Sequence, residues 1–310
     1  MSSKQQDSIV KFDIVKNRRK FFVFSGAILL LGLVAILMFG FNLGVDFKAG
    51  TRLDLYIGKE FTTADVEAVI RSEVPDVAFK PVTTFGDQNA WATTTFEETI
   101  EMEKLVAIET ELKSKYGEQV SKQESTVNPE IAREMVRNAA IAILLASVGI
   151  VLYIAFRFQF LFGIGAIISL LHDAFIPIAL FSILRLEIDL TFIAAILTIV
   201  GYSINDTIVV FDRIRENMRT MKIKTVEDLE HMVNVSLWQT MRRSVFTVLT
   251  VFFTALALAV FGSEGIRNFS LALIFGLVSG TYSSIFIAAQ VWVSLKKREM
   301  RKKRYASSPQ

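Results

Sequence analysis

The sequence has 310 residues, of which 52% are hydrophobic and 21% are charged, and its mean hydropathy is +0.44. The apolar residues form long uninterrupted runs, which excludes an ordinary soluble enzyme and a disordered chain. The chain has no cysteine, which excludes disulfides and thiolate zinc sites, and its two histidines argue against a multi-histidine metal site.

Six of the apolar runs are long enough to cross a bilayer, whose hydrocarbon core of about 30 Å needs roughly 20 helical residues. Six buried helices in so short a chain would leave too little polar sequence to cover them, so we predict six transmembrane helices. The first run is too long for the apolar core of a signal peptide, and we expect it to be retained. The predicted spans are 21–41, 139–156, 160–184, 190–211, 245–261 and 269–295.

Basic residues give the predicted bundle an orientation. Most of the 34 Lys and Arg residues lie on one side of it, in the N-terminal tail 1–20, at Arg157, in the loop 212–243 and in the C-terminal tail 296–310. The short loops on the other side hold only Arg185 and Arg267. The positive-inside rule then predicts a multi-pass protein of the cytoplasmic membrane with both termini in the cytoplasm. The basic segments are expected to contact membrane lipid and not nucleic acid, and the loop is expected to include a short amphipathic surface helix.

Residues 42–138 form the only long polar segment on the other side, with the composition of a small soluble domain. Their pattern predicts a strand, a helix, two strands, a helix and a last strand, which is the ferredoxin-like order. We therefore expect one small α+β extracytoplasmic domain. It has no His, Cys or glycine-rich phosphate loop, so we expect no catalytic or metal site, and a role in binding a passing chain or a partner. The predicted elements are strand 52–57, the helix capped at Thr62, strands 77–85 and 90–96 around a turn at 86–89, the helix ending at Gly117, and strand 118–127.

The few ionisable groups inside the spans are the candidate functional residues, because a charge at the bilayer centre costs about 2.5–3.5 kcal/mol on insertion scales. His172 and Asp173 lie near the middle of the third span. Asn205 and Asp206 lie in the fourth span, toward its predicted cytoplasmic end. The two spans are joined by a very short connection, so these residues are expected to meet in one polar seam, with Arg243 within reach of it.

Such a seam suits proton transfer, because a carboxyl group in a medium of low dielectric constant can take up and release a proton near neutral pH. An arginine that moves toward or away from Asp206 would switch its charge. One charge crossing a potential of 100 mV releases about 2.3 kcal/mol, enough for roughly a fiftyfold bias. Two alternatives stay open: Asp206 forms a purely structural pair with Arg243 or Arg213, and His172 serves only to hold Asp173 by a hydrogen bond.

Several short motifs in the sequence are specific enough to compare with known families. Residues 44–51 read GVDFKAGT, residues 171–173 read LHD, residues 200–217 read VGYSINDTIVVFDRIREN, and residues 234–237 read NVSL before Arg243. With these motifs the sequence resembles the SecF family, which forms the smaller half of the SecD–SecF protein-export complex. The resemblance extends over nearly the whole chain. The residues that match the signature after the first span are Gly44, Asp46, Phe47, Gly50 and Thr51.

The resemblance implies half of an RND-type fold, with SecD supplying the other six spans. It implies a role in late steps of protein export, powered by protons, in which the complex handles unfolded polypeptide beside the SecYEG channel and SecA. Asp206 and Arg243 fall on positions that the family uses for proton transport, and only the resemblance favours Arg243 over Arg242. We expect no enzymatic activity and no cofactor besides the coupling proton. Two alternative functions remain. The chain could be one half of an RND-type exporter of small molecules or lipids, which the short segment 42–138 disfavours, or it could be a non-transporting translocon scaffold.

Overall fold

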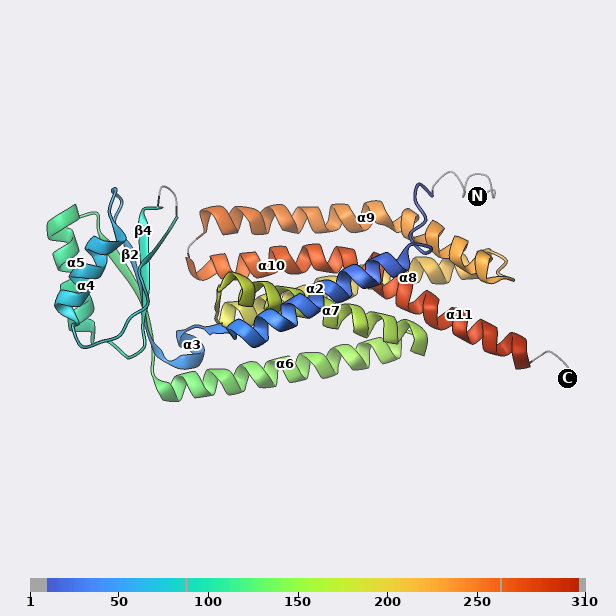
Figure 1. The fold of residues 1–310 in the computed structure, drawn as a ribbon, viewed down its shortest axis with the longest axis horizontal. Helices are drawn as coiled ribbons and strands as arrows, with labels where there is room; N and C mark the ends of the chain where they lie inside the picture. The colour runs from blue at the N-terminus through green and yellow to red at the C-terminus, as the bar shows by residue number, and fades with distance from the viewer. Residues whose placement is uncertain (1–9, 87–88, 263, 307–310) are drawn as a thin grey trace.

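The computed structural model describes residues 10–86, 89–262 and 264–306. Parts of the two predicted tails (1–9 and 307–310) and of the predicted turn (87–88) lie outside the described residues. A bundle of long helices carries a small sheet domain (residues 50–127) at one end, which we call the domain end (Figure 1). Helix α2 begins, and helix α11 ends, at the opposite end of the bundle, which we call the far end.

The described residues contain six helical segments long and apolar enough to cross a membrane, in agreement with the six predicted spans. The last of them is one continuous segment interrupted by a π-helical turn, η2. The segments are α2 (Arg18–Phe39), α6 (Pro129–Arg157), α7 (Phe160–Leu184), α8 (Leu190–Thr220), α9 (Val226–Phe261), and α10 (Glu264–Ser283) with η2 (Ser284–Ala288) and α11 (Ala289–Ala306).

The predicted loop 212–243 with a separate short surface helix is wrong. Helix α8 continues to Thr220 and α9 begins at Val226, so only residues 221–225 connect them. Thr225 starts α9 with a capping box that it shares with Asp228, and no Gly or Pro follows to break the helix before Gly262. Hydropathy marks the stretch that lies in the bilayer, whereas the helix extends as far as its backbone hydrogen bonds do.

The sheet domain is a four-stranded antiparallel sheet in the order β3-β4-β2-β5. Two helices cover the face away from the bundle (Figure 1). Leu53, Leu55 and Ile57 are fully buried against these helices, as the alternation in this strand predicts, and the other sheet face turns toward the bundle. The elements are β2 (Gly50–Tyr56), α4 (Thr63–Glu73), β3 (Thr83–Phe85), β4 (Trp91–Phe96), α5 (Met102–Tyr116) and β5 (Ser121–Val127).

Three short elements join the sheet domain to the bundle. Strand β1 (Asn42–Leu43) follows α2 and pairs in parallel with β6 (Glu187–Ile188), which lies between α7 and α8. Helix α3 (Val45–Lys48) then leads into β2. On the other side of the domain, β5 runs into α6, whose first residue is Pro129, so residues 129–138 form the start of this long helix and are not part of the sheet domain.

Candidate functional site

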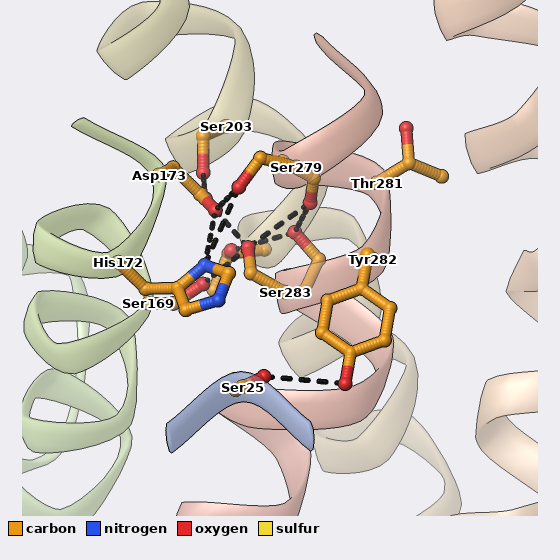
Figure 2. A network of polar contacts seen from close by, with 12 residues as sticks. Ser25, Ser169, His172, Asp173, Ser203, Ser279, Thr281, Tyr282 and Ser283 are labelled. Atoms are coloured by element: carbon orange, nitrogen blue, oxygen red, sulfur yellow. Dashed lines mark hydrogen bonds and ion pairs between the residues drawn. The ribbon is translucent and has the colours of Figure 1, made fainter. Parts of the chain in front are cut away.

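The Asp173 carboxyl group is completely buried in the bundle and accepts four hydrogen bonds (Figure 2). Its Oδ1 accepts from Ser279 Oγ at 2.8 Å and from His172 Nδ1 at 3.0 Å. Its Oδ2 accepts from Ser203 Oγ and Ser283 Oγ, each at 2.5 Å. A buried polar group is costly unless it is paired, so these donors make Asp173 the polar centre of the bundle.

Three helices supply this centre. Asp173 and His172 come from α7, Ser203 comes from α8, and Ser279 and Ser283 lie one turn apart on α10, so they face the carboxyl group together. A serine of α7, Ser169, donates to Ser283 Oγ at 2.8 Å and extends the network by one hydroxyl. The packing of α7, α8 and α10 therefore depends on one carboxyl group.

Asp206 lies one turn along α8 from Ser203, so the structure brings both aspartates to the same seam. Only 8% of Asp206 is exposed. Within the described residues its Oδ2 has no hydrogen-bond partner, and neither does the buried hydroxyl of Ser244 on α9, a neighbour of the carboxyl group. Asp173 therefore accepts four well-formed hydrogen bonds, whereas Asp206 Oδ2 accepts none among the described residues, although the hydroxyls of Ser244 and Ser284 lie close to the carboxyl group.

A second neighbour of Asp206, Ser284, belongs to the π-helical turn and lies 3.0 Å from Thr207 Oγ1. A π-helical turn inserts one extra residue into a helix and often marks a functional position. Here the turn follows directly after Ser283, so hydroxyl groups on two adjacent residues serve Asp173 and the Asp206 region.

The two predicted ion-pair partners of Asp206, Arg243 and Arg213, are not bonded to it in the described residues. Arg243 lies exposed on α9, and no ion pair joins it to Asp206 in the part of the chain that the structure describes. Arg213 instead donates to Glu216 Oε2 and to Gln239 Oε1, each at 2.6 Å. Asn205 is exposed on α8 next to the buried Asp206. Neither ion pair left open by the sequence forms among the described residues, and the side chains of Asn205 and Arg243 are exposed.

Residues 42–48, which we call the joint, carry most of the predicted signature. They connect α2 with the N-terminal end of α8. Gly44 N donates to Ile188 O at 2.9 Å, and Asp46 Oδ2 accepts from Leu190 N at 2.9 Å. Lys80 Nζ reaches from the sheet domain to Asn42 Oδ1 at 3.0 Å. These contacts fix the first strand after α2 against the α7–α8 connection.

Glu187, at the α7–α8 connection, lies against Gly44 of the joint and is mostly buried. Burial raises the pKa of its carboxyl group, and Lys80 and Arg52 from the sheet domain oppose that rise. A Cβ on Gly44 would lie 2.5 Å from Glu187 Oε1 and 3.1 Å from its Cγ, so any larger residue at this position would displace the Glu187 side chain.

The other three signature residues, Phe47, Gly50 and Thr51, have different surroundings from Gly44 and Asp46. Phe47 packs against the apolar cluster that includes Phe181 and Phe192 in the bundle. Gly50 has a φ of 125°, which favours glycine, and Thr51 Oγ1 accepts from Ile100 N at 2.9 Å inside the sheet domain. The signature is therefore mainly structural and spans both bodies of the molecule.

Sequence reasoning missed the serines that bind Asp173. Serine is frequent in membrane helices, where its hydroxyl often bonds the carbonyl of its own helix, so a single serine carries little information. The spacing of Ser279 and Ser283 on one helix face was the available signal. The described residues hold no cluster of three or more His, Cys, Asp or Glu side chains that could bind a metal ion.

Together, the six spans and the two buried carboxyl groups define a polytopic membrane protein with a polar core. The model of the family "Protein export membrane protein SecD/SecF, C-terminal" matches residues 107–298, and the model of the SecD/SecF GG motif matches residues 34–55, which include the joint. The chain belongs to the SecD/SecF family of protein-export membrane proteins.

Individual relatives agree. The protein translocase subunit SecF of Alicyclobacillus acidocaldarius is 46% identical over 295 residues, covering 94% of this chain and 95% of the relative. The protein translocase subunit SecDF of Bacillus subtilis is 45% identical over 292 residues, but the chain spans only 39% of its length. The crystal structure of SecDF from Thermus thermophilus superimposes with a TM-score of 0.80 at 32% identity, covering 93% of this chain and 39% of that one.

Proposed function

We propose that the chain acts as the SecF-type half of a protein-export complex, in which a SecD-type partner supplies the remaining spans. Two SecDF relatives support this pairing, because this chain aligns with only 39% of their longer sequences. In the proposal the complex works beside the SecYEG channel and SecA, and it uses the proton gradient to promote late steps in the export of unfolded polypeptide. The chain is not an enzyme, and it needs no cofactor besides the proton.

The placement of the basic residues supports a position in the cell membrane with both termini in the cytoplasm. The far end of the bundle is then cytoplasmic, and the sheet domain is extracytoplasmic. Its strand order and the two helices on one face of its sheet support a ferredoxin-like domain, which we infer to contact the exported chain.

One observation carries the proton-driven role: Asp206 is buried in a membrane helix and keeps an unpartnered carboxyl oxygen among the described residues. Intramembrane carboxyl groups are expensive and commonly serve proton transfer. Arg243 and Asn205 face outward on the neighbouring surface, where a partner's helices would bring them into a shared polar interface. Asp173 and His172 form the fixed part of the seam, and Asp206 is the group that exchanges the proton.

The test is Asp206→Asn in the complete complex, reconstituted with the translocon in vesicles. The amide cannot carry a proton, so we expect the part of export that depends on the proton gradient to disappear while export driven by ATP alone continues. Complex assembly should be unchanged. The same substitution at the exposed Asp76 of the sheet domain is the matched control and should have no effect.

If Asp206→Asn exports as well as the unaltered chain, the proton-driven role is wrong. A scaffold role then remains, in which deletion of the sheet domain is harmful although the aspartate is dispensable. Measuring proton flux into the same vesicles, with and without the partner, separates transport of protons from mere assembly.

A further inference from the structure

The joint contacts both bodies of the molecule through alternate residues. Val45 packs with Val127, at the end of β5, and with Ala132, in the first turn of α6. Leu43 and Phe47 pack instead against the bundle cluster that contains Ile188 and Phe192. The joint is therefore held between the sheet domain and the first turn of α8.

Asp46 makes the polar link in this contact. Helix α8 begins with Asp189 as its N-cap, whose Oδ1 accepts from Phe192 N at 2.7 Å. The first helical N–H, on Leu190, is bonded by Asp46 Oδ2 at 2.9 Å, from a segment remote in sequence. Side chains that accept from the first N–H groups of a helix fix its end, and removing one usually costs about 1 kcal/mol. Asp46 therefore ties the start of α8 to the joint.

Helix α8 is also the helix that carries Ser203 and Asp206. Helix α8 runs without a break from its N-cap beside the joint, through the seam, to the far end. A shift of its first turn therefore moves the whole helix. A packed helix moves as a rigid body because its neighbours leave no space for local bending. The joint is therefore a mechanical connection between the sheet domain and the carboxyl group of Asp206.

We propose that Asp46 is a positioning residue that couples the sheet domain to α8, so that movement of the domain changes the environment of Asp206. The proposal rests on the proton-driven function proposed above. The hydrogen bond to Leu190 N, and not the charge of Asp46, performs the coupling. Asp46 contacts the first residue of α8, remote from Asp206, and therefore acts on Asp206 through the helix.

The comparison of Asp46→Ala with Asp46→Asn tests this, because an asparagine side chain retains the accepting oxygen and loses only the charge. In vesicles that hold the complete complex and the translocon, we expect Asp46→Ala to lower the gradient-dependent part of export about fivefold. We expect Asp46→Asn to export like the unaltered chain. ATP-driven export without a gradient should be equal in all three.

A second readout separates coupling from stability. A hydrophobic carbodiimide reacts with protonated carboxyl groups in membranes, so the pH midpoint of its reaction with Asp206 reports the environment of that residue. We expect the midpoint to move in Asp46→Ala and to stay in Asp46→Asn. If Asp46 only stabilised the fold, the midpoint in the assembled complex would be the same in all variants.

A restraint at the same place should restore the coupling. The chain has no cysteine, so Leu43→Cys and Ile188→Cys, at register partners of the β1–β6 pair, form a unique thiol pair. Oxidation of this pair should return Asp46→Ala to normal gradient-dependent export, and it also keeps the joint closed if that variant alone assembles poorly. Failure of the closed pair to restore export overturns the proposal.

The outcomes separate the two proposals. If Asp206→Asn abolishes the gradient-dependent part of export while Asp46→Ala leaves both export and the midpoint unchanged, the coupling by Asp46 is wrong and the proposed function stands. If Asp46→Asn is as defective as Asp46→Ala, the charge and not the hydrogen bond matters, and the proposal is wrong. If Asp206→Asn is itself without effect, the proposed function fails first.

Discussion

Two buried carboxyl groups in one seam can have different roles when their oxygens are satisfied differently. Asp173 uses both oxygens, with two donors on each, and three of the donors are hydroxyls from α8 and α10. A rotation of this carboxyl group would break its hydrogen bonds to two neighbouring helices, α8 and α10, at once. Asp206 has an unpartnered oxygen in the described structure, so its bonding can change without such a rearrangement.

Ser283→Ala should therefore destabilise the bundle. The substitution removes a 2.5 Å hydrogen bond to Asp173 and leaves Ser169 without its acceptor. We expect a loss of about 1 kcal/mol in the free energy of unfolding, since hydrogen bonds to charged groups contribute about 1.5–3 kcal/mol in water and less between membrane helices. The measurement is the midpoint of thermal unfolding in detergent.

Ser294→Ala is the matched control, because the Ser294 hydroxyl donates only to Gln290 O of its own helix, at 2.8 Å. It should leave the midpoint unchanged. Equal stability of the two variants would show that the hydroxyl of Ser283 contributes nothing to the Asp173 centre.

At this scale the sequence predicted the charged residues and missed their partners. Asp173 and Asp206 were recognisable because a carboxyl group in an apolar run is rare and costly. Ser203 and Ser283 were not, because serine is common in such runs, and only the fold shows which hydroxyl meets a carboxyl group. The outward position of Arg243 was equally hidden, because no rule of local sequence gives the rotation of α9 about its axis.

At the scale of elements, helices α8 and α10 pack closely along the seam, and glycines on α10 allow the approach. A Cβ on Gly276 would lie 2.6 Å from Cγ2 of Ile199 and closer still to its Cδ1. Ile199 is buried and β-branched, so it cannot turn away. On Gly280, one turn further along, the nearest atom to an added Cβ is Ser203 Cβ at 3.4 Å, an ordinary contact.

Gly276→Ala should therefore force α8 and α10 apart and lower the free energy of unfolding by about 1–3 kcal/mol, the usual cost of overpacking. Gly280→Ala should be neutral or slightly stabilising, because alanine favours helix by about 1 kcal/mol and the space exists. Unfolding of both variants in detergent gives the comparison. If Gly276→Ala is as stable as Gly280→Ala, the close packing at Ile199 is wrong.

The elements themselves were largely predictable where one local pattern specifies each of them. Hydropathy gave the six spans, and alternation and capping placed β2 and α4. The β1–β6 pair was not predictable, since each strand has two residues and neither shows a periodicity. The short amphipathic helix predicted in the loop and the predicted fifth span proved to be one helix, α9, because no helix-breaking residue separates its polar first turns from its apolar part.

At the scale of the whole molecule, α2 is anchored at both ends. The joint holds its domain end against α8. At the far end, Asn234 of α9 binds the segment that precedes α2: its Oδ1 accepts from Ile14 N at 3.0 Å and from Val15 N at 3.2 Å. Close by, Glu230 accepts from Arg18 Nη1 at 2.8 Å and from Lys297 Nζ at 2.5 Å, which ties in α11. A tilt of one helix is thereby transmitted to the others.

The anchor at the far end predicts local exchange behaviour. In Asn234→Ala the amides of Ile14 and Val15 lose their acceptor, and two hydrogen bonds at about 1 kcal/mol each correspond to about thirtyfold easier opening of this segment. Hydrogen exchange followed by mass spectrometry on the complete chain should show this acceleration in the peptide that contains both residues, with the peptides of α7 unchanged. Asn217→Ala is the matched control: Asn217 donates to Ser236 Oγ and Gln239 Oε1, at the same end of the bundle, and has no hydrogen bond to this segment. Equal protection of Ile14 and Val15 in Asn234→Ala and in the unaltered chain would mean that apolar burial alone holds the segment, since both side chains are almost completely buried.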